Sequence, residues 1–132
     1  VLVTGGAKRI GRTIALAFAQ RGWDVALHYG RSRSDARATA REIEALGRRT
    51  VLLAADLANE KDVRALLPQA VRALGRIDCV VNNASLFSLD TAVDTSFASM
   101  AAHYAINTAA PVLLARELHR LTADGAQACV IN

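Results

Sequence analysis

The chain begins with Val1-Leu2-Val3-Thr4-Gly5-Gly6-Ala7-Lys8-Arg9-Ile10-Gly11, and this stretch decides the fold. Its first residues are apolar and favour a strand, which ends in a turn that contains adjacent glycines. After the turn, apolar residues recur at the spacing of one helix face, at Ile10, Ile14, Ala17 and Phe18. A strand, a glycine turn and a helix follow one another, and such a turn presents free backbone N–H groups and the positive end of the helix dipole to an anion.

The rest of the chain alternates in the same way. We expect further strands at 24–28, 50–55, 77–81 and 128–131. We expect helices at 10–21, 36–46, 60–74 and 97–121, with Asn59 capping the third and glycines closing the first three. Pro68 should kink the third helix, and Pro111 should begin a new helical segment after a bend in the fourth.

Apolar strands separated by helices are typical of a parallel sheet that is covered on both faces. The predicted fold class is therefore α/β, a doubly wound parallel sheet of Rossmann type. No repeat, low-complexity tract or linker indicates a second domain, so residues 1–132 are treated as one domain. Cys79 and Cys129 lie inside apolar runs, where we expect buried core thiols.

The composition fits a globular domain with a core of useful size, since 52% of the residues are apolar. The net charge of +4 raises the question of an anionic partner. Arginines interleave with acids along the predicted helices, which is typical of a solvated face, so we expect no nucleic-acid partner. No apolar run approaches the roughly 18 residues of a membrane span, and no signal-peptide pattern is visible. We expect a cytoplasmic protein without a membrane partner or a metal site.

The residues after the second strand indicate which cofactor would occupy the turn. In a Rossmann unit an acid at this point binds the ribose hydroxyls of NAD, whereas an arginine accommodates the 2′-phosphate of NADP. The stretch 28–34 reads His-Tyr-Gly-Arg-Ser-Arg-Ser, with guanidiniums and hydroxyls but no carboxylate. These groups suit phosphate recognition and predict NADP(H). An exposed basic loop without a ligand is the alternative.

The spacing G-x-G-x-x-G is absent, because Lys8 stands where a glycine would be needed. The run Thr4 to Gly11 instead resembles the T-G-x-x-x-G-x-G turn of the short-chain dehydrogenase/reductase superfamily, with Arg9 replacing the middle glycine. Asp56-Leu57 resembles the family's adenine-contacting pair, Asn82-Asn83-Ala84 its N-N-A motif, and Asn107 its structural and catalytic asparagine. These signposts occur in the expected order and cover nearly the whole chain.

The resemblance implies a set of site residues. Asn107 would be catalytic, and the cofactor would be bound by Thr4, Gly5, Lys8, Arg9, Ile10, Gly11, His28, Tyr29, Arg31, Ser32, Asp56, Leu57, Asn82, Asn83 and Ala84. From the residues alone, Asp56 could simply cap a turn, and Asn82 and Asn83 could satisfy loop amides. Asn107 lies among apolar neighbours, where we expect a buried amide that must find hydrogen-bond partners.

Several departures from the general pattern resemble pteridine reductases. They are Arg9 in the turn, His28-Tyr29-x-Arg31-Ser32, and Ser85 after the N-N-A motif. The resemblance implies that Phe87 stacks on a pterin ring and that Arg9 reaches both the cofactor phosphate and the substrate. The substrate would then be bound by Arg9, Ser85 and Phe87. A loop aromatic that plugs the local core is the alternative for Phe87.

The superfamily donates its proton from a Y-x-x-x-K motif, which this chain does not contain. Four residues after Tyr29 and Tyr104 come Arg33 and Thr108. We therefore expect a piece of a longer protein, truncated after the fifth strand, inactive alone and with an exposed sheet edge.

Three functions are compatible with these observations. The first is an NADPH-dependent reductase of a pterin or dihydrofolate. The second is a general carbonyl reductase of the same superfamily, acting on 3-oxoacyl thioesters or sugars. The third is a non-catalytic NADP(H)-binding module. The resemblance also implies a homo-oligomer, a tetramer in many relatives, and a small-molecule substrate with a carbonyl or imine group.

Overall fold

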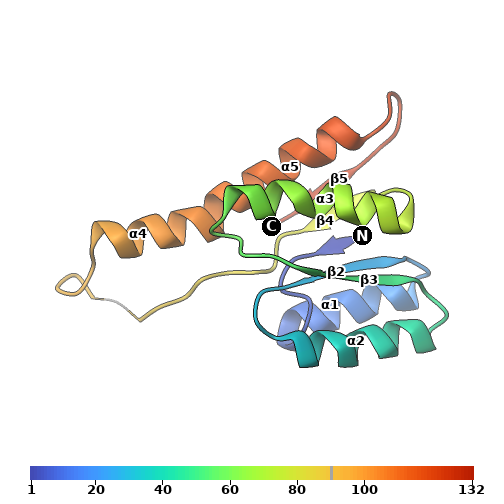
Figure 1. Cartoon of the computed structure of the whole chain (residues 1–132), viewed down its shortest axis with the longest axis horizontal. Coiled ribbons are helices and arrows are strands. Elements are labelled where there is room, and N and C mark those ends of the chain that lie inside the picture. The colour runs from blue at the N-terminus through green and yellow to red at the C-terminus, as the bar shows by residue number, and fades with distance from the viewer. Residues whose placement is uncertain (90) are drawn as a thin grey trace.

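The computed structural model describes residues 1–89 and 91–132, and its centre is a parallel sheet of five strands in the order β3-β2-β1-β4-β5 (Figure 1). The strands are β1 (Leu2–Val3), β2 (Val25–Tyr29), β3 (Thr50–Ala54), β4 (Cys79–Val81) and β5 (Cys129–Ile131). The helices are α1 (Arg9–Gln20), α2 (Arg33–Ala45), α3 (Glu60–Leu74), α4 (Phe97–Tyr104) and α5 (Ala110–Leu121). A π-helical turn, η1 (Ala105–Ala109), joins α4 to α5. The predicted doubly wound α/β class is confirmed.

Helices cover both faces of the sheet, as Figure 1 shows: α1 and α2 lie on one side, and α3 and α5 on the other. The first side is packed with small residues and branched chains, including Ala15, Ala19, Ala36 and Ile43. The second side holds larger side chains from α3 and α5, including Leu66, Leu67 and Leu114. This two-sided burial explains why the strands are apolar runs without alternation.

The prediction that Pro111 begins a new helical segment is confirmed. A π-helical turn, η1, precedes α5, which has Pro111 in its first turn, where no intrahelical N–H is needed. The α3 helix is assigned as one continuous helix through Pro68. Of the helices in the described ranges 1–89 and 91–132, none has the length and apolar character to cross a membrane.

The predicted burial of one of the two cysteines was wrong. Cys129 is exposed because β5 is the edge strand, as we expected for the strand itself but not for its thiol. Ile10, at the start of α1, and Leu46, at the end of α2, are exposed. Cys79 is buried as predicted, and burial, with the neighbouring Cys129 thiol, raises its pKa to about 12, so it remains a neutral core thiol.

The strand order reverses direction between β1 and β4. The chain runs outward from β1 to β2 and β3, and then returns to place β4 on the other side of β1. In open α/β sheets, ligands bind at such a switch point, outside the carboxyl ends of the strands. The glycine turn and the segment after β4 both lie there.

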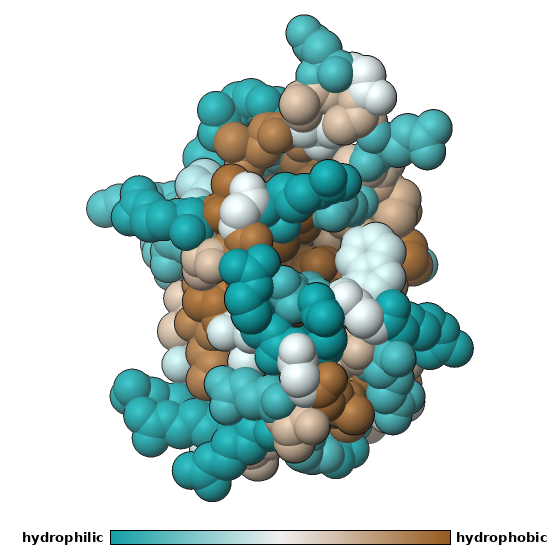
Figure 2. Space-filling view, turned by 90° about the vertical axis from the view of Figure 1, so that its right-hand side faces the viewer, coloured by the Kyte–Doolittle hydropathy of each residue, from teal (hydrophilic) through white to brown (hydrophobic). Residues whose placement is uncertain are grey.

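Ion pairs lie at the other end of the strands, between residues that immediately precede them. Asp24 binds Arg48 and Arg49, and Asp78 binds Arg76. The side of the molecule seen in Figure 2, the right-hand side of Figure 1, is accordingly covered largely by projecting hydrophilic side chains.

Candidate functional site

The glycine turn joins β1 to α1 in a conformation that exposes backbone N–H groups. Gly5 has a φ of +63°, in the left-handed region that favours glycine. Lys8, the residue before α1, is extended, and its side chain caps no backbone N–H of the helix. The first turn of α1 carries no acidic residue. The positive end of this helix thus lacks a side-chain acceptor of its own.

Gly11 allows the closest contact in the turn. A Cβ at this position would overlap the carbonyl oxygen of Gly5 and would approach Asn83 Nδ2 to 2.6 Å. Only a residue without a side chain lets α1 start against the turn in this way.

Arg9 is the one non-glycine residue in the described parts of the chain with a positive φ, at +53°. The middle glycine of the superfamily's motif corresponds to this position, so Arg9 keeps a conformation that favours glycine. Such a conformation costs on the order of 1 kcal/mol or more for a residue with a side chain. Backbone strain of this kind collects at functional sites, where the side chain has a use.

We expect Arg9→Gly to relieve this strain and to weaken binding of the phosphate-bearing cofactor at the same time. The melting temperature should stay the same or rise, because glycine adopts the φ of position 9 freely, although its unfolded chain has more entropy. Cofactor affinity should fall about tenfold, the loss of one charged hydrogen bond of roughly 1.5 kcal/mol. Thermal unfolding measures the change in melting temperature, and a fluorescence titration measures the change in cofactor affinity. A variant that melts at lower temperature and binds normally would contradict the assignment.

The N-N-A segment is fastened to the end of β1. Thr4, only 1% exposed, accepts hydrogen bonds of 3.0 Å from the backbone N–H groups of Asn83 and Ala84 and donates to the carbonyl of Val81. Asn83 Nδ2 donates to the carbonyls of Thr4 and Gly5. These residues hold the two loops of the switch point together, so Thr4 and Asn83 shape the site and their side-chain polar groups bind protein.

His28 supports the same turn from β2. It is 2% exposed, its Nδ1 accepts the N–H of Gly5 at 3.1 Å, and its Nε2 lies 3.2 Å from the carbonyl oxygen of Ala55. Nε2 therefore carries the hydrogen and donates it, since a carbonyl only accepts. Burial lowers the pKa of His28, although the Ala55 carbonyl opposes this in part, so the neutral ring is favoured. His28 borders the cavity but commits both nitrogens to the protein.

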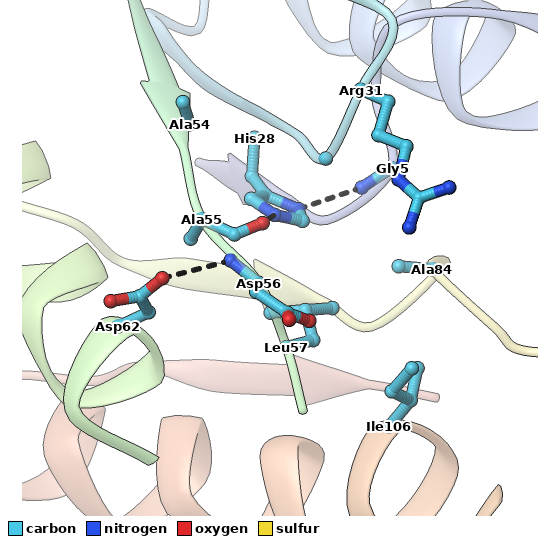
Figure 3. A pocket seen from close by; sticks show the side chains of 11 residues that line it. Gly5, His28, Arg31, Ala54, Ala55, Asp56, Leu57, Asp62, Ala84 and Ile106 are labelled. Carbon is cyan, nitrogen blue, oxygen red and sulfur yellow. Dashed lines mark hydrogen bonds between the residues drawn. The ribbon is translucent and has the colours of Figure 1, made fainter. Parts of the chain in front are cut away.

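A cavity of about 480 Å³ opens at this edge, between the ends of β1, β2 and β3 (Figure 3). Its lining includes Gly5, Arg31, Asp56, Leu57 and Ile106. Figure 3 shows the Arg31 side chain extending past Gly5 into the open space above Ala84.

Asp56 performs the turn-capping role that the sequence left open. Its Oδ1 accepts the N–H of Ala58 at 2.9 Å, while its backbone N–H donates to Asp62. Asp56 also lines the cavity, so its carboxylate stands next to the space in which a ligand would lie. Asp62 lines the same cavity and was missed by the sequence reasoning, since an acid in the first turn of a helix is an ordinary feature.

A second hollow of about 290 Å³ adjoins the first, because Gly5 and Ala84 line both. The other residues around it are Lys8, Arg9, Ile10, Gly11, Asn83 and Ser85. The exposed Ile10, which the resemblance placed among the cofactor-binding residues, lines this hollow. Together the two hollows make one cleft along the carboxyl edge, and we refer to them below as the cleft.

The two arginines of the basic stretch after β2 lie in different places. Arg31 lines the cleft, whereas Arg33 lies with Arg37 and Arg41 along the outside of α2. Ser32 precedes α2 and its hydroxyl caps no backbone N–H of that helix. Tyr29 packs partly against the core beside α1 and α2. Arg31 is thus the arginine of this stretch that lines the cleft, and Ser32 follows it in the sequence.

A third hollow adjoins the cleft, since Ser85 lines both. Asn82 and Asn107 line this hollow with Ser85, and Asn82 Nδ2 donates to Asn132. The Oδ1 of Asn82 is a buried oxygen without a hydrogen-bond partner in the described residues. Phe87 is 83% exposed, so the alternative that it plugs the local core is wrong.

Asn107 finds hydrogen-bond partners, but the expected burial is wrong. Its Oδ1 accepts the N–H of Leu86 at 2.8 Å and its Nδ2 donates to the carbonyl of Leu86 at 2.9 Å. It is exposed because η1 lies where the helix has passed the edge of the sheet (Figure 1). π-helical turns are frequent at functional sites, and this one carries the predicted asparagine.

The sequence reasoning also missed His103 and Ser88. His103 Nε2 lies 2.7 Å from Ser88 Oγ, and His103 Nδ1 lies 3.4 Å from Asn107 Nδ2. The spacing of four residues between His103 and Asn107 was a usable signal, because such residues are neighbours on a helix.

Comparison with known proteins connects this cleft to a family. A family model described as short chain dehydrogenase matches residues 1–132. The chain is 36% identical over 115 residues to hydroxynaphthalene reductase arp2 of Aspergillus fumigatus, covering 87% of this chain and 42% of that protein. It is 39% identical over 85 residues to the 3-oxoacyl-(acyl-carrier-protein) reductase FabG of Staphylococcus aureus, covering 64% of this chain and 35% of that protein.

Among solved structures, FolM alternative dihydrofolate reductase 1 from Brucella suis in complex with NADP is similar with a TM-score of 0.92. The identity is 36%, and the match covers 98% of this chain and 53% of that one. The chain therefore spans about half, or less, of the length of these relatives.

Proposed function

Because this chain belongs to the short chain dehydrogenase family, we propose that its cleft binds NADP(H) and forms the cofactor half of a reductase. The observation that carries the proposal is the junction of the glycine turn, the uncapped start of α1 and Arg31 around one cleft. The turn and helix offer N–H donors for a pyrophosphate, and Arg31 offers a guanidinium for a further phosphate.

The residues present fit a dinucleotide phosphate in three respects. Position 11 must lack a side chain, because a Cβ there would overlap the carbonyl oxygen of Gly5, so the start of α1 packs closely against the turn. Arg31 extends into the cleft, where the second strand of an NAD-specific unit would supply an acid. The solved relative FolM carries NADP at 36% identity.

NADPH, when bound, supplies a hydride to the substrate. The residues of this chain bind and orient it. We assign the pyrophosphate to the turn from Gly5 to Gly11, the 2′-phosphate to Arg31 and Ser32, and the adenine end to Asp56 and Leu57. Tyr29, His28, Thr4, Asn82 and Asn83 hold these elements in place. Asn107 belongs to the reacting end, where its amide fixes the loop that follows Ser85.

For the substrate we propose a pterin or dihydrofolate. The support is the exposed ring of Phe87 two residues after Ser85, the presence of Arg9 and Ser85 around the same hollow, and the similarity to FolM, an alternative dihydrofolate reductase. A flat heteroaromatic ring can stack on a phenyl ring, and its polar edge can pair with a guanidinium.

Phe87→Ala tests the substrate assignment in the full-length protein that contains this chain. We expect KM for dihydrobiopterin to rise about tenfold, since one stacked aromatic pair contributes roughly 1 kcal/mol beyond the area it buries. NADPH affinity should stay unchanged. Val93→Ala, at an exposed apolar residue outside the helical stretch, is the control. An unchanged KM for the pterin in Phe87→Ala would remove the stacking role.

A general carbonyl reductase is the second candidate. FabG acts on a 3-oxoacyl substrate by its name, and arp2 is a hydroxynaphthalene reductase, and both are similar to this chain. Steady-state turnover of dihydrobiopterin against an oxoacyl thioester separates the two candidates. Turnover of the thioester alone would replace the pterin assignment and leave the cofactor assignment intact.

A non-catalytic NADP(H)-binding module differs from both candidates in having no proton donor. The following part of the gene decides this point, because a Y-x-x-x-K motif there excludes the module.

We also propose that the protein forms a homo-oligomer in the cytoplasm. The support is a row of exposed apolar side chains on the helical stretch from α4 to α5, at Phe97, Met100, Tyr104 and Val112. Surfaces of this kind are usually covered by a partner.

A further inference from the structure

The loop after β4 is tied to the helical stretch on both sides of Phe87. Leu86 exchanges two backbone hydrogen bonds with the amide of Asn107, of 2.8 and 2.9 Å. Ser88 pairs with His103 at 2.7 Å. Phe87 itself is 83% exposed, so its ring is not held by packing.

The bonds to Leu86 fix which way the amide of Asn107 points. Oδ1 faces a backbone N–H, which only donates, and Nδ2 faces a carbonyl, which only accepts. A flipped amide would place oxygen against oxygen and nitrogen against nitrogen. The orientation therefore follows from the backbone of Leu86.

The fixed amide determines the tautomer of His103. Nδ2 of Asn107 carries only hydrogens, and it lies 3.4 Å from Nδ1 of His103, so Nδ1 must be the acceptor. A neutral imidazole then carries its hydrogen on Nε2 and donates it to Ser88 Oγ. Each member of the chain from Leu86 through Asn107 and His103 to Ser88 thus has one possible role.

The direction of the hydrogen bond from His103 to Ser88 excludes a catalytic triad built from Ser88, His103 and Asn107. A serine, a histidine and an asparagine in a row resemble the order of a nucleophile, its base and an orienting residue. A histidine that activates a hydroxyl must accept the proton of that hydroxyl, whereas Nε2 of His103 donates. Ser88 is therefore not an activated nucleophile, and the group has a positioning use.

We propose that Ser88 and His103 are positioning residues, which together with Asn107 clamp the loop so that Phe87 is held ready to stack on a flat heteroaromatic substrate. The inference rests on the proposed function, because it concerns the same substrate-binding end of the cleft. Fixing the backbone of one loop residue costs about 1–2 kcal/mol of entropy, and each hydrogen bond contributes about 0.5–1.5 kcal/mol. Three bonds on the two neighbours of Phe87 can therefore order it before the substrate arrives, and the substrate then meets a preorganised ring.

The clamp is tested by variants of the full-length protein. His103→Leu and Ser88→Ala should each raise KM for dihydrobiopterin three- to tenfold and leave NADPH affinity within twofold. The double variant should be no worse than His103→Leu alone, because both single changes remove the bond between Ser88 and His103. Neither change should have a further effect in Phe87→Ala. His103→Gln, whose amide nitrogen can still donate to Ser88, should restore much of the affinity, and His119→Leu on α5 is the matched control.

Two measurements test the hydrogen bonds of the clamp without relying on substrate turnover. Nitrogen-15 shifts of His103 should report the Nε2–H tautomer, and the amide of Leu86 should exchange with solvent at least tenfold faster in His103→Leu. A protein without pterin turnover that passes both tests would overturn the proposed substrate and keep the clamp. The clamp would be overturned if His103 carried its hydrogen on Nδ1, or if the effects of His103→Leu and Ser88→Ala were independent. It would also be overturned if either change kept its full effect on KM in the Phe87→Ala protein.

Discussion

Replacing Gly11 with alanine is expected to weaken cofactor binding strongly and to lower the melting temperature, although helix propensity alone predicts a higher melting temperature. Position 11 lies inside α1, where alanine normally stabilises a helix by about 1 kcal/mol relative to glycine. Here the added Cβ would overlap the carbonyl oxygen of Gly5 and would lie 2.6 Å from Asn83 Nδ2. Backbone must move to make room, which costs about 1–3 kcal/mol or more, and the movement distorts the turn itself.

The affinity for NADPH should fall on the order of 100-fold, since a distorted turn misplaces several N–H donors at once. Thermal unfolding followed by circular dichroism and a fluorescence titration with NADPH measure the two effects. Gln20→Ala, an exposed position at the end of the same helix, is the control for the gain in helix propensity. A Gly11→Ala protein that melts higher and binds normally would show that the turn is not closely packed.

Replacing Arg31 with alanine is expected to remove most of the preference for NADPH over NADH. Arg31 lines the cleft and is the residue assigned to the 2′-phosphate. This phosphate is the only group that distinguishes the two cofactors. Hydrogen bonds to a charged group contribute about 1.5–3 kcal/mol, so NADPH affinity should fall roughly 10- to 100-fold. NADH affinity should change less than about threefold, since Arg31 is assigned no contact with it.

Arg33→Ala provides a matched control, because Arg33 carries the same charge two residues away but lies on the outside of α2. If the effect of Arg31 were only the general field of a basic loop, both variants would weaken NADPH binding alike. Added salt would then erase the difference, since the fields of exposed charges are screened within about 10 Å at 0.1 M salt.

Much of the fold could be predicted from the sequence because its signals are local. The strand, turn and helix from Val1 to Gly11 follow from glycine placement and apolar spacing, and the structure has these elements within a residue or two of the predicted bounds. The face of α3 was predicted for the same reason, since Val63, Leu66, Leu67 and Ala70 recur at helical spacing and are buried.

The errors concern properties that depend on distant parts of the chain. Asn107 and Cys129 have apolar neighbours in sequence, but their exposure depends on where the helix and the edge strand lie relative to the sheet. The pairing of His103 with Ser88 spans 15 positions in the chain and crosses from a helix to a loop. The role of His28 required its partners Gly5 and Ala55, which come from two other strands' ends.

At Arg9 an unusual feature of the sequence coincides with an unusual backbone conformation. Its departure from the glycine pattern is visible in the sequence, and its left-handed backbone shows that the position still favours glycine. The strained arginine beside the cleft is the type of feature in which stability is given up for function.

The central claim is that the cleft binds NADP(H) by its phosphates, and the most direct test is a fluorescence titration of the unmodified protein with NADPH and with NADH. We predict saturable binding of both, with NADPH at least about tenfold tighter, as expected for one charged contact to the 2′-phosphate. Equal affinities for the two cofactors, or no binding of either, would contradict the account.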